Sequence, residues 1–273
     1  MDDGRVSNFA LRFIGIRFDF LSLVPRPSSF IICLLFLITG CATYNPATGR
    51  NELIFIGTDT EIMLGDDFHR QISSQYKFSQ EAVKTDRLKR IGQRLAQVSD
   101  RQDYAYQFFL IEHKELNAFT IPGGRIYLFS GLYDRLKTDD QIAAVLAHEI
   151  GHCAARHTIK KFQAALGYNA LMNIALGRIG SEGARQVASI SANTIMNLAS
   201  SAYGRRDEYE ADRLGLKYMH LAGHDLEGMI QSFQILEQES KGSRPPLILS
   251  THPYIDDRIT AVRNEIPKIQ QAY

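Results

Sequence analysis

Two histidines stand four residues apart in the stretch AHEIGHCAARH, and a glutamate directly follows the first. If this segment is helical, His148 and His152 lie one turn apart on the same face, with their Cβ atoms roughly 5 to 6 Å apart. Two neutral imidazoles at that spacing can bind one metal ion, and a hydrolytic zinc site then needs a third protein ligand and an open position. Glu149 stands where its carboxylate could reach a water beside the metal without binding the metal itself. The pattern predicts metal-assisted hydrolysis with Glu149 as the general base.

A pair of acidic residues downstream, in DEYEAD, could complete this site. Glu208 and Asp212 are four residues apart, so a helix would present both on one face. Glu208 would be the third ligand, and Asp212 could accept the second N–H of a ligating histidine and fix its tautomer. Glu210 is the alternative third ligand, but it points about 200° around the helix from Glu208 and would not share a face with Asp212. We therefore expect His148, His152 and Glu208 to hold one zinc ion.

The chain resembles the zinc metallopeptidase family of the CAAX prenyl endopeptidase, HtpX and BepA in four motifs, which follow one another as NAFTIPGGRIYLFSGL, HEIGHCAARH, EYEAD and STHPYIDDRI. The resemblance covers about residues 48–258 and is strongest to the short outer-membrane lipoprotein members. It implies an α+β fold, a mainly helical zincin-like metallopeptidase domain with a small β-sheet or hairpin beside the active-site helix. The family pattern also gives this chain its zinc ligands, its general base and the carboxylate behind them: His148, His152, Glu208, Glu149 and Asp212.

The resemblance implies further roles around the site. His252, in a His-Pro pair, would face the metal and either assist an oxyanion or block the open position; a loop histidine without a catalytic part is the alternative. Arg258, six residues later, would support the ligands. Asn117, Ala118 and Phe119 would begin the edge strand on which a peptide substrate adds as an extra strand. A plain structural hairpin is the alternative for that segment.

Hydrophobic periodicity predicts the elements that must position these residues. The expected elements are helices over 58–76 and 79–99, a strand over 106–113, a hairpin over 117–131 that turns at Pro122-Gly123-Gly124, the helix that carries His148, and helices over 204–223, 225–240 and from 256 onward. Thr58 with Glu61 and Thr138 with Gln141 fit the capping-box pattern at two helix starts. Val83 is expected on the apolar face of the second helix.

Composition excludes some classes of function. Hydrophobic residues make up 45% and charged residues 22% of the 273 residues, a balance typical of a folded domain. The net charge of +1, without a long basic run, argues against a nucleic-acid partner. A helical region over 168–203 carries few charges. We expect a buried core helix there; a helix that lies against a membrane or covers the active site is the alternative.

The remaining cysteine and histidines receive plainer interpretations. Cys153 lies about 100° around the helix from His152, which favours a core position over metal binding. Arg156 and His157 follow on the same helix. Each could cap the helix or support a ligand, or could have no role in the site. No sequence partner suggests a site for the other four histidines, which are His69, His113, His220 and His224.

The N-terminal segment has the features of a lipoprotein signal. FIICLLFLITGC is an apolar run too short to span a bilayer, and its small residues before Cys41 resemble a bacterial lipobox. The alternative is a plain membrane anchor or a chance cysteine. We expect a signal peptide over 1–40, a lipidated tether over 41–57 with the lipid on Cys41, and a zinc metallopeptidase domain over 58–273. By resemblance to bacterial lipoproteins, Ala42 after the cysteine favours the outer membrane, with the protein facing the periplasm.

These features predict a zinc-dependent metalloendopeptidase that hydrolyses peptide bonds of misfolded or misassembled envelope proteins by a metal-activated water. Its expected partners are such substrates, the membrane through the N-terminal lipid, and partner proteases or assembly machinery, with no nucleic acid. The alternative is a non-proteolytic envelope assembly factor or holdase lipoprotein with a structural zinc. Glu149 favours the peptidase, because a structural site needs neither an open position nor a base.

If Cys41 carries the lipid, Cys41→Ser should leave the precursor unprocessed and release no chain of mature size. Cys33→Ser, in the same apolar run, should mature like the wild type because Cys33 leaves with the signal. Immunoblotting of cell envelopes separates the two forms by size. Normal maturation of the Cys41→Ser chain would rule out the lipoprotein interpretation.

Overall fold

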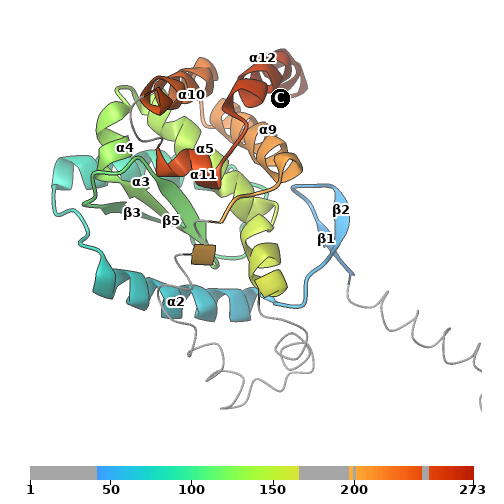
Figure 1. Ribbon diagram of the computed structural model, residues 1–273. Coiled ribbons are helices and arrows are strands. Elements are labelled where there is room, and N and C mark those ends of the chain that lie inside the picture. Colours follow the sequence, from blue (N-terminus) through green and yellow to red (C-terminus); the bar gives the residue numbers. More distant parts are fainter. Residues whose placement is uncertain (1–41, 166–196, 199–200, 242–245) are drawn as a thin grey trace, which may run out of the picture. The chain divides into compact units, whose positions relative to one another are not determined.

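The computed structural model describes residues 42–165, 197–198, 201–241 and 246–273. Within this part of the chain a small sheet lies among helices (Figure 1). The expected signal peptide, Cys41 and most of the helical region over 168–203 lie outside the described residues. None of the helices described is long and apolar enough to cross a membrane.

The sheet has three strands in the spatial order β3 (Gln107–Ile111), β5 (Arg125–Phe129) and β4 (Ala118–Ile121). β4 and β5 form the expected antiparallel hairpin. It turns through Gly123 and Gly124, whose φ angles of 78° and 73° are ones that L side chains rarely adopt. β3 pairs with β5 in parallel, which the sequence did not indicate. This order leaves β4 at one edge of the three-stranded sheet.

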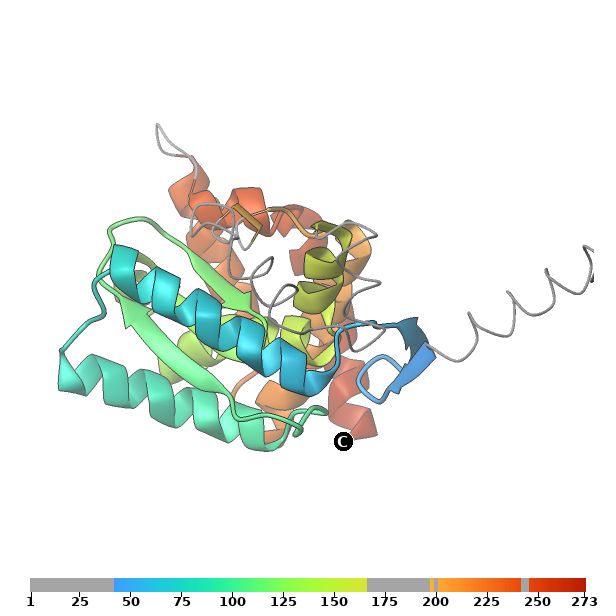
Figure 2. The ribbon, with the colours of Figure 1, turned by 90° about the horizontal axis from the view of Figure 1, so that it is seen from below.

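Helices cover both faces of the sheet because its side chains alternate between the faces. Phe119 and Tyr127 point to one face and pack with Phe68 in one apolar cluster. Phe108 and Leu128 point to the other face and belong to the larger core. The covering helices are α2 (Thr58–Gln75) on the first face, and α3 (Ala82–Gln97) and α5 (Asp139–Ala154) on the second. Figure 2 shows α2 crossing the sheet, with the axis of α3 roughly parallel to it in this view.

The remaining elements surround α5. They are the hairpin of β1 (Ala42–Asn45) and β2 (Arg50–Leu53), α4 (Ser130–Arg135), α9 (Arg205–Leu221), α10 (Glu227–Ser240), α11 (Leu247–Thr251) and α12 (Ile255–Ala272). α9 and α10 pack directly on α5, and α12 packs on both of them. The expected α+β, mainly helical zincin-like fold with a small sheet beside the active-site helix is confirmed.

α5 is the central helix of the domain. Its expected capping box is present, with the Gln141 amide donating to the Thr138 hydroxyl and the Gln141 side chain accepting from the Thr138 amide. Beyond the first turn every residue of the helix is buried. Any side chain that α5 presents is therefore shielded from bulk water.

Two details predicted from local sequence are wrong. α2 has no side-chain cap; the Thr58 hydroxyl donates to Asp103, and Glu61 is buried against Arg101 with Oε2 and Nη2 2.6 Å apart. A buried guanidinium requires a counter-charge. Glu61 therefore pairs with Arg101, and its carboxylate does not cap the helix. Val83 is 85% exposed in the first turn of α3, because the face that packs begins further along that helix.

Glu61→Gln should lower the free energy of unfolding by about 3 kcal/mol, because it leaves the Arg101 guanidinium buried without its main counter-charge. Asp103 also contacts Arg101 and keeps the loss near the lower end of the range for breaking a buried ion pair. Glu112→Gln is the control, since the Glu112 pair with Lys77 is exposed and should contribute less than about 1 kcal/mol. Urea unfolding measures both. Equal losses would contradict the account of the buried pair.

Candidate active site

α5 and α9 touch backbone against backbone, and this contact decides where their side chains meet. A Cβ on Gly151 would lie 2.7 Å from the carbonyl oxygen of Ala211, and a Cβ on Gly215 would lie 3.2 Å from the amide nitrogen of His148. Larger side chains at either glycine would push the helices apart. The close approach lets imidazoles from α5 and the Glu208 carboxylate from α9 reach one point.

Four buried side chains bring donor atoms within 4.8 Å of one another: His148, His152, Glu208 and His252. The Nε2 atoms of the first two histidines are 3.1 Å apart, and Glu208 lies 3.4 Å from His152 and 3.6 Å from His148. His252, which ends α11, places Nδ1 3.2 Å from His148 and 3.1 Å from Glu208. Ligands bound tetrahedrally at about 2.0 to 2.1 Å are about 3.3 Å apart, so this donor set fits one metal ion.

The chemistry of the donors also fits a metal. Imidazole nitrogens with one carboxylate suit a transition metal, whereas calcium and magnesium prefer oxygen ligands. Burial holds the pKa of His152 well below its ordinary value, so the ring is neutral as a metal ligand must be. Cys153 is buried in the core, where Sγ lies 3.0 Å from the Thr120 hydroxyl, and it does not belong to the group.

Asp212 and Arg258 hold the ligands from behind. Asp212 Oδ1 lies 2.8 Å from Nδ1 of His148, which places that proton on Nδ1 and leaves Nε2 free to bind a metal. Arg258 contacts Asp212 through two nitrogens at 2.6 and 2.8 Å and reaches Glu208 at 2.5 Å. Burial raises the pKa of both carboxyls. His252 and Arg258 outweigh this effect at Glu208, and Arg258 outweighs it at Asp212, so both pKa values lie below their ordinary range.

Glu149 lies beside the four donors as a buried carboxylate. Neither of its oxygens has a hydrogen-bond partner among the described residues, and Oε1 is 3.4 Å from Nε2 of His252. Burial lowers the pKa of His252, but the Glu208 and Glu149 carboxylates reverse this, so the net direction is upward. A space of about 20 Å³, lined mostly by apolar side chains but also by His148, Glu149 and His252, adjoins the donors and has room for one water molecule. A buried carboxylate without a hydrogen bond is costly unless it has a use there, such as moving a proton.

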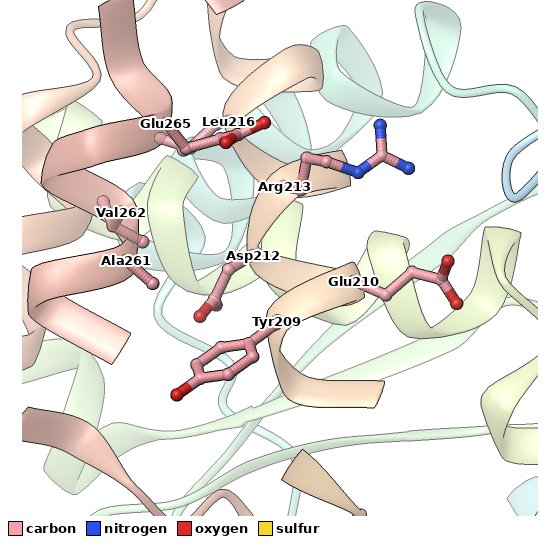
Figure 3. Close-up of a pocket in the computed structure, with 8 residues that line it drawn as sticks. All are labelled: Tyr209, Glu210, Asp212, Arg213, Leu216, Ala261, Val262 and Glu265. Carbon is pink, nitrogen blue, oxygen red and sulfur yellow. The ribbon is translucent and has the colours of Figure 1, made fainter. Parts of the chain in front are cut away.

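Glu210 does not belong to the group of four donors. Figure 3 shows its side chain leaving α9 in the direction opposite to Asp212, as the helical geometry predicted. Its carboxylate contacts Arg50 and His157 instead. The same view shows a hollow of about 300 Å³ between α9 and α12, which none of the four donors lines.

The segment predicted to bind substrate includes an edge strand of the sheet. β4 is an edge strand of the described sheet, and Thr120 connects it to α5 through Cys153. Asn117, Ala118 and Phe119 are all buried, and the side-chain amide of Asn117 has no hydrogen-bond partner within the described ranges. Addition of a peptide to this edge stays a prediction.

Two contacts of His152 were not predicted. The Tyr203 ring stacks on it with centroids 3.8 Å apart, and His157, whose role the sequence left open, places Nδ1 3.0 Å from its Nδ1. Tyr203 stands at the end of a stretch without clear periodicity, so no local signal indicated its position. The other four histidines, expected to form no site, do not belong to the donor group: His69, His113, His220 and His224.

Comparison with known proteins assigns the family. The profile of peptidase family M48 matches residues 82–266. The chain belongs to peptidase family M48. The resemblance recognised from the four motifs is thereby confirmed, and membership together with the buried donors indicates a bound metal ion.

Several M48 relatives carry names that describe proteases. The beta-barrel assembly-enhancing protease of Escherichia coli (strain K12) is 32% identical over 227 residues, which are 80% of this chain and 46% of that protein. Metalloprotease LoiP of the same strain is 31% identical, covering 66% of this chain and 69% of LoiP. The mitochondrial metalloendopeptidase OMA1 of Schizosaccharomyces pombe is 26% identical, covering 83% of this chain and 67% of OMA1. The chain spans about half the length of the beta-barrel assembly-enhancing proteases.

Glu208→Gln should weaken metal binding by more than about 100-fold, because it removes a ligand, whereas Asp212→Asn should cost about 10- to 100-fold as the loss of a supporting partner. Glu227→Gln, an exposed change in the first turn of α10, is the control and should bind like the wild type. Competition with a chromogenic chelator gives the three affinities. Wild-type affinity in the Glu208→Gln chain would contradict the ligand assignment.

Proposed function

We propose that this chain is a zinc-dependent endopeptidase that cuts unfolded segments of bacterial envelope proteins. The observation that carries the proposal is Glu149, a buried carboxylate without hydrogen-bond partners in the described structure, beside two imidazoles and a carboxylate. Two histidines and one glutamate form a ligand set of catalytic zinc sites. The adjoining space of about 20 Å³ suits one water molecule within reach of the base.

Zinc, when bound, polarises a peptide carbonyl and lowers the pKa of the attacking water toward about 7. His148 and His152 present Nε2 to it, and Asp212 keeps the proton of His148 on Nδ1. Glu149 takes a proton from the water and returns it to the leaving amine. The burial of these side chains excludes bulk water and strengthens each electrostatic interaction among them.

The edge strand β4 supports an extended substrate. A peptide that adds to a sheet edge is held by backbone hydrogen bonds, which depend little on its sequence. Unfolded or misassembled proteins expose such segments, whereas folded proteins keep them paired. Asn117, Ala118 and Phe119 would form the receiving edge.

We place this activity in the bacterial envelope. Two of the relatives are E. coli proteases, and the name of one refers to β-barrel assembly. The lipobox-like segment ending at Cys41 supports an outer-membrane lipoprotein facing the periplasm. Partner proteases or assembly machinery would then deliver the unfolded substrates.

A second candidate function rests on His252. With its Nδ1 as a fourth donor, the set resembles the closed four-ligand arrangement of structural zinc sites. Such a site would suit a non-proteolytic assembly factor or holdase. Glu149 favours the peptidase, because a structural site leaves a buried carboxylate that accepts no hydrogen bond in the described structure without a use.

Glu149→Gln should abolish digestion of unfolded casein, a loss of at least about 100-fold, and should retain zinc because Glu149 is not a ligand. Glu227→Gln again serves as the exposed control. Peptide release is measured by gel and mass spectrometry, and zinc by elemental analysis. Undiminished cleavage by the Glu149→Gln chain would refute the mechanism; aggregation suppression without cleavage in both forms would favour the holdase.

His252→Ala should raise proteolysis if Nδ1 fills the position that water needs, and its 3.1 and 3.2 Å distances to Glu208 and His148 lead us to expect this result. If His252 instead stabilises an oxyanion, kcat should fall roughly 10²- to 10³-fold. His220→Ala, outside the donor group, is the control. Initial rates on casein distinguish the two roles, and an unchanged kcat would reject both.

A further inference from the structure

His152 has a second buried imidazole behind it. His157 is 2% exposed and lies with Nδ1 3.0 Å from Nδ1 of His152. Arg156, in the left-handed conformation with φ of 58°, interrupts the helix just before His157, and the turn brings His157 against the ligand. Nε2 of His152 faces the other donors and must be free of a proton to bind a metal. Nδ1 of His152 therefore carries the ring proton and donates a hydrogen bond to Nδ1 of His157.

A carboxylate orients His157 in turn. Its Nε2 lies 3.3 Å from Glu210 and 3.5 Å from Asp207. Because Nδ1 of His157 accepts from His152, the proton of His157 lies on Nε2, which donates to Glu210. Arg50 holds the same Glu210 oxygen at 2.6 Å.

The β1–β2 hairpin that carries this arginine is fixed to the C-terminal end of α5. Asn45 Nδ2 donates to the carbonyl of Ala154 at 3.1 Å. Lys160 Nζ joins the hairpin residue Glu52, at 2.7 Å, to the carbonyl of Ala155, at 2.9 Å. These bonds satisfy carbonyls that a helix end leaves without partners. The hairpin and the helix of the metal ligands therefore have a fixed relation.

We propose that the β1–β2 hairpin is part of the metal site, because Arg50, Glu210 and His157 form a relay that orients His152. Asp212 makes the equivalent contact to His148 directly, whereas His152 reaches its carboxylate through a second imidazole. The three relay residues are positioning residues. This inference rests on the proposed zinc site.

The relay gives the N-terminal segment a function beyond that of a tether. The hairpin begins at Ala42, directly after Cys41. A change in how the hairpin sits on α5 would therefore alter the orientation of His152, and with it the affinity for zinc.

The test uses the full chain and measures zinc dissociation constants by chelator competition. His157→Leu and Glu210→Met should weaken zinc about 10- to 100-fold, as expected when a partner behind a ligand is lost, and Arg50→Met should weaken it by a smaller factor. Glu210→Gln keeps an acceptor oxygen and should recover part of the affinity. Lys160→Met removes another contact between this hairpin and α5 without touching the relay, so it should weaken zinc less than Arg50→Met does.

Ring ¹⁵N chemical shifts give a second readout, which reports the tautomer of His157 directly. In the zinc-loaded wild type, His157 should carry its proton on Nε2, and Glu210→Met should give a mixture of tautomers. A wild-type His157 protonated on Nδ1 would overturn the relay, and so would unchanged zinc affinity in the Glu210→Met chain.

Equal losses in Lys160→Met and Arg50→Met would assign the effect to hairpin docking in general and would also overturn the relay. If the wild type binds zinc tightly and Glu149→Gln loses cleavage as expected, while the relay variants behave like the wild type, the relay alone is wrong. If the wild type binds no zinc, the proposed function fails with it.

Discussion

The close contact between α5 and α9 is the constraint on which the rest of the site depends. Gly151 and Gly215 permit backbone atoms of the two helices to meet without side chains between them. Imidazole and carboxylate side chains are short, so ligands from separate helices converge only when the helices approach this closely. The sheet, α10 and α12 pack around the pair and keep it buried.

Burial of α5 and α9 removes charged carboxylates from water, and buried arginines provide their counter-charges. Glu208 and Asp212 are withdrawn from water, and Arg258 contacts both. Glu61 and Arg101 repeat the arrangement away from the site. Removing one member of such a pair is more damaging than replacing both, because an unpaired buried charge remains. Glu149, the expected general base, has no such hydrogen bond from an arginine in the described structure. In this respect it differs from Glu208 and Asp212.

Sequence reasoning succeeded where local geometry decides the outcome. The spacing of His148 and His152, and of Glu208 and Asp212, places each pair on one face of a helix, and both helices form as expected. It failed where distant segments compete, as when Arg101 draws Glu61 away from the predicted capping box. The parallel pairing of β3 with β5, and the connection of Glu210 to the hairpin, likewise join segments far apart in sequence. No periodicity within one segment can indicate such contacts.

X-ray absorption at the zinc edge of the zinc-loaded chain tests most directly the claim that His148, His152 and Glu208 hold one ion. We predict only nitrogen and oxygen neighbours at about 2.0 to 2.1 Å, with multiple scattering from two imidazoles, or from three if His252 also binds. A sulfur neighbour at about 2.3 Å, for which Cys153 is the one cysteine in the described residues, would contradict the account. A first shell without imidazole would contradict it equally.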